Sequence, residues 1–330
     1  MTTVKKRAGF GKFVSQNMML CILLVMVVVL AIFADGFLTL SNLLGILRSV
    51  AITGVIAFGM TMVIIAGEID LSIGSTIGLS SVLVAKIGGA IADSGAMPLE
   101  VSVIIGMIAA LAVGALIGLL NGKIRTRFDI PTFIITLAML NILYGAAAII
   151  SKGFPVTTVP SWYGFIGAGM LGRIPVPAIW LVLVFAVSLI LMNYTRFGRE
   201  IYAVGGNMES ARLSGINVNR IKVTVMIVVQ VLAAFAGIIL SSQVYSGSSS
   251  FGRGYEMDVI APVIIGGASL SGGMGKVNGT LIGIIFLGIL LNGMTLLGVD
   301  DYVKYVVRGF VILVAVLVNA IQDELAKKSR

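Results

Sequence analysis

The chain contains a succession of apolar runs, each close to the length that a helix needs to cross a membrane. A transmembrane helix takes about 20 consecutive apolar residues. The eighth of the predicted runs is the shortest and indicates a broken or partly re-entrant helix, which is tolerated only where protein or a water-filled cavity covers its ends. The pattern predicts an all-α polytopic membrane protein of about ten transmembrane helices, at residues 17–34, 48–67, 71–92, 99–121, 131–151, 177–194, 223–242, 257–270, 278–298 and 303–321.

The composition excludes several other classes of protein. Hydrophobic residues make up 58% of the chain and charged residues 11%, against roughly 25% charged residues in an average soluble domain. The mean hydropathy is +1.09. Cys21 is the single cysteine and histidine is absent, so the chain cannot form an internal disulfide, a cysteine metal cluster or a Ser–His or Cys–His catalytic pair. We therefore expect neither an enzyme nor a metal site.

The placement of Lys and Arg predicts the orientation in the membrane, because cytoplasmic loops carry an excess of these residues. With the N-terminus in the cytoplasm, ten spans return the C-terminus to the same side, and the net charge of +9 needs no nucleic-acid partner. Most of the 23 Lys and Arg residues then fall on the cytoplasmic side, at residues 5–12, 123–127, 196–222, 276 and 327–330.

The predicted organisation is a single transmembrane domain over residues 1–330, because no polar segment is long enough to fold alone. Its cytoplasmic parts are a short basic N-terminus (1–16), a large loop (195–222) and a C-terminal tail (322–330). An internal inverted repeat is also predicted, since Asn121-Gly122 precedes Asp129 by the same interval at which Asn292-Gly293 precedes Asp300. Residues 67–74 also resemble residues 266–273, but the number of residues between these two segments differs from that in the first pair.

The longest polar interruption, residues 202–222, is basic and contains the pattern E-x-A-x-x-x-G at Glu209, Ala211 and Gly215. Small residues at two of these positions leave a groove for a partner, and the glycine is expected to end a short helix. Asn207 and Arg212 belong to the same candidate surface, and the flanking charges keep it at the membrane boundary. The alternative is a solvated basic loop that only orients the protein.

The segment 67–75, GEIDLSIGS, supplies candidates for a substrate pathway or gate: Gly67, Glu68, Asp70 and Ser72. A carboxylate at membrane depth is costly and normally faces a bundle interior or a water-filled cavity. The flanking glycines permit unwinding, and Asp70 is suited to cap the following helix. Three interpretations stay open: contact with substrate, a gate at the inner face, or a turn in which Asp70 is a helix cap.

Two further groups of polar residues have a functional and a structural interpretation. Asn141, in the middle of a span, either contacts substrate or bonds across helices. Tyr255, Glu256 and Asp258 mark either an external docking or entrance site, or a helix start whose dipole the acids stabilise. Arg253 is close enough in sequence to pair with Glu256 or Asp258.

The chain resembles the ribose-type sugar permeases of ATP-binding-cassette importers, a family that also includes galactoside and autoinducer-2 importers. The pattern at Glu209, Ala211 and Gly215 resembles the coupling motif of such permeases, and Glu68 stands where the family commonly has a glycine. The resemblance covers nearly the whole chain in order, through GEIDLSIGS (67–75), TRFGREIYAVGGN (195–207), ARLSGINVNRIK (211–222), YEMDVIAPVIIGG (255–267) and LSGGMGKVNGTLIG (270–283).

The resemblance implies a subunit of a larger assembly in the bacterial cytoplasmic (inner) membrane. Its implied partners are a second permease copy or paralogue, two cytoplasmic ABC ATPase domains and a periplasmic or extracellular sugar-binding protein. The chain itself is expected to bind no cofactor, with ATP and magnesium on the partner ATPase. The run Gly272–Lys276 agrees, since it lacks the first glycine and the Ser or Thr of a phosphate-binding loop.

The expected function is the translocation of a small neutral sugar such as a pentose or hexose, because the pathway candidates are poor in charge and rich in hydroxyl and amide groups. The alternative is an ion-coupled secondary transporter that uses Glu68 and Asp70 as its proton or sodium site. The two differ in energy source: an ATPase supplied by another chain, or an ion gradient.

Overall fold

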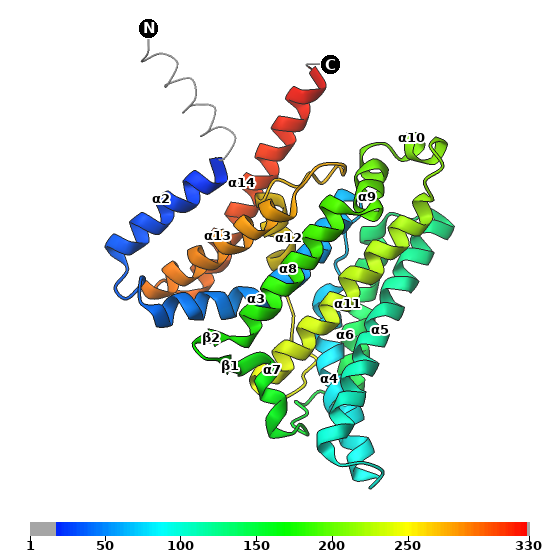
Figure 1. The fold of residues 1–330 in the computed structure, drawn as a ribbon, viewed down its shortest axis with the longest axis vertical. Coiled ribbons are helices and arrows are strands. Elements are labelled where there is room, and N and C mark those ends of the chain that lie inside the picture. The colour runs from blue at the N-terminus through cyan, green and yellow to red at the C-terminus, as the bar shows by residue number, and fades with distance from the viewer. Residues whose placement is uncertain (1–17, 329–330) are drawn as a thin grey trace.

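The computed structural model describes residues 18–328, apart from the side chains of 18, 318–320 and 322–328; the N-terminal segment 1–16 and the end of the tail lie outside it. The described chain is almost entirely helical (Figure 1). Its longer helices are α2 (Met18–Phe33), α3 (Leu40–Ile65), α4 (Ile73–Asp93), α5 (Leu99–Phe128), α6 (Thr132–Ser151), α8 (Val176–Tyr194), α11 (Val218–Val244), α13 (Val277–Leu296) and α14 (Asp301–Lys328).

Short elements connect these helices. A two-stranded hairpin of β1 (Met170–Leu171) and β2 (Ile174–Pro175) precedes α8. The short helices are η1 (Ser161–Gly164), α7 (Phe165–Ala168), α9 (Arg196–Gly206), α10 (Met208–Leu213) and α12 (Tyr255–Ile265).

Within residues 18–328, seven helices are long and apolar enough to cross a membrane: α3, α4, α5, α6, α8, α11 and α13. The apolar α2, of 16 residues, and α12, of 11 residues, are shorter. The all-α polytopic fold is therefore confirmed, whereas the ten crossings and the inverted repeat stay predictions.

Helix α3 begins earlier than the span predicted at 48–67. Thr39 caps its first turn by accepting a hydrogen bond from the backbone N–H of Asn42 at 3.3 Å, as expected of a threonine N-cap. Arg48 therefore lies within the helix, where its guanidinium donates to the carbonyl oxygen of Ala168 at 3.2 Å. The prediction was wrong because it treated Arg48 as the edge of an apolar run.

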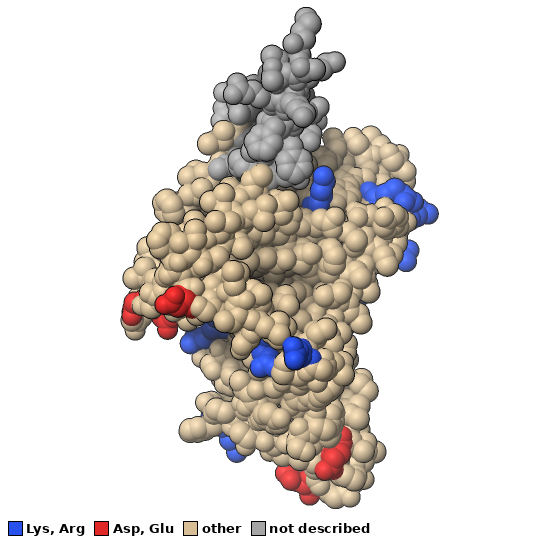
Figure 2. Space-filling model, turned by 60° about the vertical axis from the view of Figure 1, so that its left-hand side comes forward, with Lys and Arg blue, Asp and Glu red and all other residues tan. Residues whose placement is uncertain are grey.

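The core is built around α3, α4 and α11, which lie inside the bundle, with α5, α6, α8, α12 and α13 packed around them (Figure 1). Glycines bring helices close together: a Cβ on Gly118 or Gly122 of α5 would collide with the backbone of α11. The outward faces of α5 and α6 expose large apolar side chains, including Leu116, Ile142 and Ile149. Figure 2 shows a face on which uncharged side chains predominate, as lipid contact requires.

The segment between α11 and α12 is not helical, although it lies inside the bundle. Gly247 forms an antiparallel bridge with Val156, with two backbone hydrogen bonds of 2.8 Å. Residues 248–252 then run along α4, where the N–H of Ser248 donates to Ser81 Oγ at 3.1 Å. The short eighth helix predicted at 257–270 is seen as α12, which begins at Tyr255 and ends at Ile265.

Candidate functional site

The molecule has two ends that differ in structure. Figure 1 shows α9, α10 and the end of α14 at the upper end, and the β1–β2 hairpin, α7 and the turn between α4 and α5 toward the lower end. We call these the α10 end and the hairpin end. The predicted loop 195–222 lies at the α10 end, as do Gly67 and Glu68, which follow the last turn of α3.

The predicted loop is ordered and consists largely of two short helices. Asn207 caps α10, its Oδ1 accepting the N–H of Ser210 at 2.8 Å. Gly215 ends α10 with φ +81°, the left-handed conformation that favours glycine, and the N–H of the next residue returns to the carbonyl oxygen of Ala211 at 3.0 Å. Asn217 then caps α11 through the N–H of Arg220. The small residues therefore shape this loop.

The exposed side chains of α10 form a surface of mixed character. Met208 and Leu213 are apolar and exposed, Leu213 to 81%, and Glu209 and Arg212 are exposed and charged. Ala211 is only 4% exposed and packs into the core of this chain, so it does not offer a groove. We call Met208, Glu209, Arg212 and Leu213 the α10 surface; its contact with a partner stays a prediction.

Helix α9 joins this surface to the transmembrane core through backbone contacts. A Cβ on Gly205 would overlap the carbonyl oxygen of Ile65, the last residue of α3. The same carbonyl oxygen accepts the N–H of Gly273 at 2.8 Å, and the hydroxyl of Tyr202 donates to the carbonyl oxygen of Gly275 at 2.9 Å. A displacement of α9 must therefore move the end of α3 and the turn 266–275 with it.

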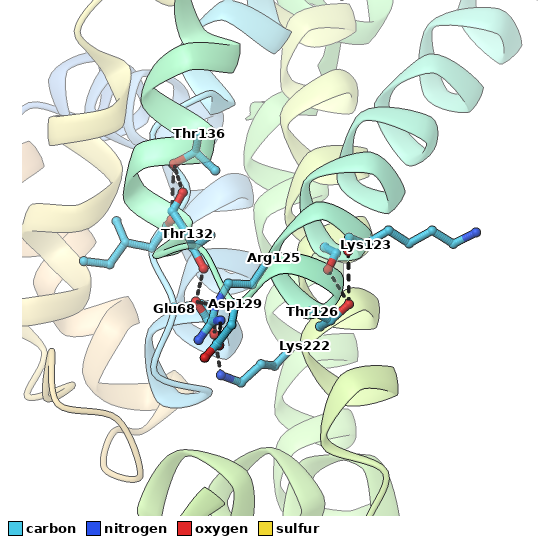
Figure 3. A network of polar contacts seen from close by, with 10 residues as sticks. Glu68, Lys123, Arg125, Thr126, Asp129, Thr132, Thr136 and Lys222 are labelled. Carbon is cyan, nitrogen blue, oxygen red and sulfur yellow. Dashed lines mark hydrogen bonds and ion pairs between the residues drawn. The ribbon is translucent and has the colours of Figure 1, made fainter.

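Glu68 lies in a buried ion cluster at the α10 end, drawn in Figure 3. Its Oε1 is 3.1 Å from Arg125 Nε and 2.5 Å from Lys222 Nζ, and its Oε2 accepts the hydroxyl of Thr132. Arg125 also binds Asp129 at 2.5 Å, and this hydrogen bond lowers the pKa of the exposed Asp129 carboxyl. Two acids and two bases thus balance, and the cluster joins the turn after α3 to α5, α6 and α11.

Sequence reasoning named Glu68 but missed its partners. Arg125 lies at the basic end of α5, and Lys222 in the first turns of α11, where each was read as an orienting charge. A buried carboxylate does demand a cation, yet several basic residues at this end met that description. Only the packing of α5 against α11 selects Arg125 and Lys222.

Asp70 lies in a second buried network, at the start of α4. Its Oδ1 accepts the N–H of Ser72 at 2.9 Å and the Ser72 hydroxyl at 2.6 Å, and its Oδ2 accepts Gln230 Nε2 at 2.7 Å. Asn121 donates to Ser72 Oγ at 3.3 Å. The network closes the turn before α4 and fastens it to α5 and α11. Neither network lines the cavities described next.

Tyr255 and Asp258 line a cavity of about 470 Å³ between α3, α12, α13 and α14. Asp258 forms an ion pair with Arg308 of α14, and Asn292 exchanges hydrogen bonds of 2.8 and 3.0 Å with Asn42. The expected pairing of Arg253 with Asp258 or Glu256 is therefore wrong, because the fold supplies Arg308 to Asp258 and places Arg253 elsewhere.

A second cavity, of about 210 Å³, brings together residues from two of the predicted groups. Asn141 of α6 and Glu256 of α12 both line it, with Ser75 of α4 and the polar segment 249–254. The guanidinium of Arg253 lies over the ring of Tyr144, 4.3 Å from its centroid. Among the described residues, no three His, Cys, Asp or Glu side chains converge as a metal site.

Comparisons with known proteins agree on one family. Residues 42–316 match the family described as the permease component of branched-chain amino acid transport systems. The chain is 43% identical to the ribose import permease protein RbsC of Bacillus subtilis, over 97% of both chains. It is 40% identical to RbsC of Escherichia coli K12, over 96% of this chain and 98% of that protein. It is 34% identical to the L-arabinose ABC transporter permease protein AraH of Azospirillum brasilense, over 95% and 90%. No solved structure matches.

Proposed function

The chain belongs to the permease-component family of branched-chain amino acid transport systems, and we propose that it is the membrane-spanning subunit of an ATP-driven importer of a small sugar. The observation that supports this most strongly is the similarity to ribose and L-arabinose permeases over nearly the whole chain. Seven apolar helices that could cross a membrane agree with a multi-pass transport subunit.

The structure does not support the alternative of an ion-coupled transporter. Its proposed site, Glu68 and Asp70, is occupied by internal partners: Arg125 and Lys222 hold the first carboxylate, and Gln230 and Ser72 hold the second. A proton or sodium site would need carboxylates that face a cavity. One relative is named as an ABC transporter permease, which supports ATP, hydrolysed by a separate subunit, as the proposed energy source here.

The proposed coupling runs from the α10 surface through α9 to the end of α3 and the turn 266–275. An ATPase that closes on binding ATP would press on Glu209, Arg212 and Leu213. Because Gly205 of α9 rests on the last carbonyl group of α3, the push would reach α3 and the turn 266–275 without a change in the loop's own fold. Two ATPase domains and a second permease copy or paralogue would complete the membrane assembly.

The remaining parts of the proposal follow from orientation. The α10 end, both termini and the tail 322–330 face the cytoplasm of a bacterial cell, and the hairpin end receives a sugar-binding protein outside. The whole chain, 1–330, forms one permease domain that crosses the membrane ten times. ATP and magnesium are bound by the ATPase, and no cofactor by this chain.

The coupling surface is tested by Leu213→Asp. Leu213 is 81% exposed, so the substitution leaves the fold intact while it places a charge where an apolar contact is expected. We expect the variant to reach the membrane at the wild-type level, to lose co-purification of its ATPase and to lose sugar uptake at least tenfold, since a buried interface hot spot contributes about 2 kcal/mol or more.

The matched control is Leu297→Asp, an exposed leucine in the turn after α13, toward the hairpin end. It adds the same charge to the same residue type away from the α10 surface. Retention of the ATPase at the wild-type level is expected for it. Equal behaviour of the two variants would exclude the α10 surface as the ATPase contact.

A further inference from the structure

The smaller cavity lies where the regular helical packing of the membrane domain is interrupted. It is bounded by the first turn of α4, the middle of α6 and the non-helical segment 249–254. Its volume of about 210 Å³ is below the roughly 300–1,000 Å³ of sites that hold drug-sized ligands. The space therefore suits one small molecule of monosaccharide size.

The segment 249–254, which lines one side of this cavity, has irregular backbone throughout. A Cβ on Gly78 of α4 would lie 3.0 Å from the carbonyl oxygens of Ser249 and Phe251, so the segment runs directly against the helix. Gly252 and Gly254 both have positive φ. Irregular backbone within a membrane domain is tolerated where protein covers it or where it lines a water-filled space. This segment has α4 on one side and the cavity on the other.

The charged side chains of the cavity are not paired with each other. Among the described residues, Arg253 and Glu256 form no ion pair: Arg253 lies over Tyr144. Glu256 lies against Gly74 in the first turn of α4, and its carboxylate accepts hydrogen bonds from the backbone of Gly254 and of Glu256 itself, which leaves further acceptor capacity for a ligand. In the larger cavity, by contrast, Asp258 and Arg308 satisfy one another. The smaller cavity thus offers a cation and an anion to a ligand, with no net charge.

The uncharged groups add donors and acceptors around the same space. Asn141 Nδ2 donates to the carbonyl oxygen of Leu137 in its own helix at 3.1 Å, and its side-chain carbonyl oxygen keeps its acceptor capacity. Ser75 donates to the carbonyl oxygen of Leu140 at 2.6 Å and keeps its acceptor capacity. Tyr144 combines an apolar ring with a hydroxyl. Neutral polyols, whose neighbouring hydroxyls both donate and accept, are matched by this set.

We propose that this cavity is a binding subsite for a single monosaccharide on the translocation route. Arg253, Asn141 and Tyr144 flank the sugar, and Glu256 accepts hydrogen bonds from its neighbouring hydroxyls. The inference rests on the proposed function, because it assigns the route to the sugar that the importer moves. It also assigns Asn141 and Glu256, which the sequence placed in separate groups, to one site.

Transport is tested in proteoliposomes that hold the complex of this chain, its ATPase and its binding protein, with radiolabelled D-ribose as the probe. Glu256→Gln removes the carboxylate charge, and Met257→Ala is the control, a neighbouring exposed side chain that does not line the cavity. We expect Glu256→Gln to lower ribose uptake about tenfold, to keep ATP hydrolysis stimulated by the loaded binding protein, and Met257→Ala to match the wild type. Wild-type uptake by Glu256→Gln would overturn the proposal.

A second measurement reports on the cavity without transport. Cys21 is the single cysteine, so Asn141→Cys in a Cys21→Ser background gives one thiol in the cavity. We expect a methanethiosulfonate reagent of sugar size to label this thiol in detergent. Millimolar D-ribose or L-arabinose should slow the labelling at least threefold relative to buffer without sugar. Labelling that neither sugar slows would overturn the subsite.

The two measurements separate the subsite from the function on which it rests. If the wild-type complex takes up ribose with ATP but neither Glu256→Gln nor the thiol responds, the subsite is wrong and the importer stands. If the wild-type complex shows no ATP-driven sugar uptake while the thiol is protected, the cavity binds sugar and the importer assignment fails.

Discussion

At the scale of single residues, the buried carboxylate of Glu68 stabilises the fold through ion pairs within the chain. Glu68 is 4% exposed and faces Arg125 and Lys222, which are 16% and 9% exposed. Removing one partner of a buried ion cluster leaves an uncompensated charge, which costs far more than the intact pair contributes. The charge of Glu68 is therefore matched by cations on α5 and α11.

Glu68→Gln is expected to destabilise the protein by about 3 kcal/mol, because Arg125 and Lys222 lose their shared anion. The measurement is the thermal midpoint of the purified protein in mild detergent. Adding Lys222→Met to the variant should recover part of the loss, since Lys222 loses its ion pair with Glu68 whereas Arg125 keeps its pair with Asp129.

The control for this prediction is Glu200→Gln, which breaks the pair of Glu200 with the 83% exposed Arg196. Surface pairs contribute about 0–1 kcal/mol, so a shift of the midpoint near zero is expected. A midpoint for Glu68→Gln no lower than that of Glu200→Gln would show that the cluster does not stabilise the fold.

At the scale of elements, the contact between α9 and α3 decides how the loop communicates with the core. Gly205→Ala would place a methyl group on the backbone carbonyl of Ile65, which cannot move aside as a side chain could. We expect α9 to shift, with loss of ATP-coupled uptake and a lower yield of folded protein measured by size-exclusion chromatography.

Gly145→Ala is the matched control for this junction. It also changes a helical glycine, but nothing lies within 4 Å of the added Cβ, so only helix propensity changes, in favour of alanine by up to about 1 kcal/mol. Unchanged or higher stability and normal uptake are expected. A Gly205→Ala variant that behaved in the same way would rule out a tight junction.

Helices are also the scale at which sequence reasoning succeeded best. Apolar runs of about 20 residues predicted the all-α fold, because a membrane span has to hide its backbone from lipid. The break before α12 was predicted, because the spans expected at 223–242 and 257–270 leave residues 243–256 outside both of them. The start of α3 was missed, because Arg48 finds its acceptor on Ala168, 120 residues away.

The site was less predictable than the fold, because many of its contacts join helices that are far apart in the sequence. Asn207 and Gly215 act through local hydrogen bonds, as does Asp70 with Ser72, and these turns and caps could be predicted from neighbouring residues. The bond of Asp70 with Gln230 could not. Which residues pair with Glu68 and Asp258 depends on which helices pack together. The same holds for the placement of Asn141 and Glu256 around one cavity. One sequence does not fix those pairings.

At the scale of the whole molecule, function is separated between the two ends and the middle. The α10 end presents an ordered, exposed surface, which we propose contacts the ATPase. The core carries buried polar networks, and cavities lined by both polar and apolar groups lie between helices. The broad apolar faces in Figure 2 suit lipid or another membrane subunit. This arrangement suits a subunit that moves a neutral solute and leaves ATP hydrolysis to another chain.

The energy source is the most direct test of this account. Uptake of radiolabelled D-ribose is measured in bacterial cells that lack their own ribose permease and express this chain with its ATPase and binding protein. Arsenate, which depletes ATP, is compared with a protonophore, which collapses the ion gradient while glycolysis maintains ATP. We predict that arsenate abolishes accumulation and the protonophore leaves most of it. Accumulation that survives arsenate and collapses with the protonophore would contradict the account.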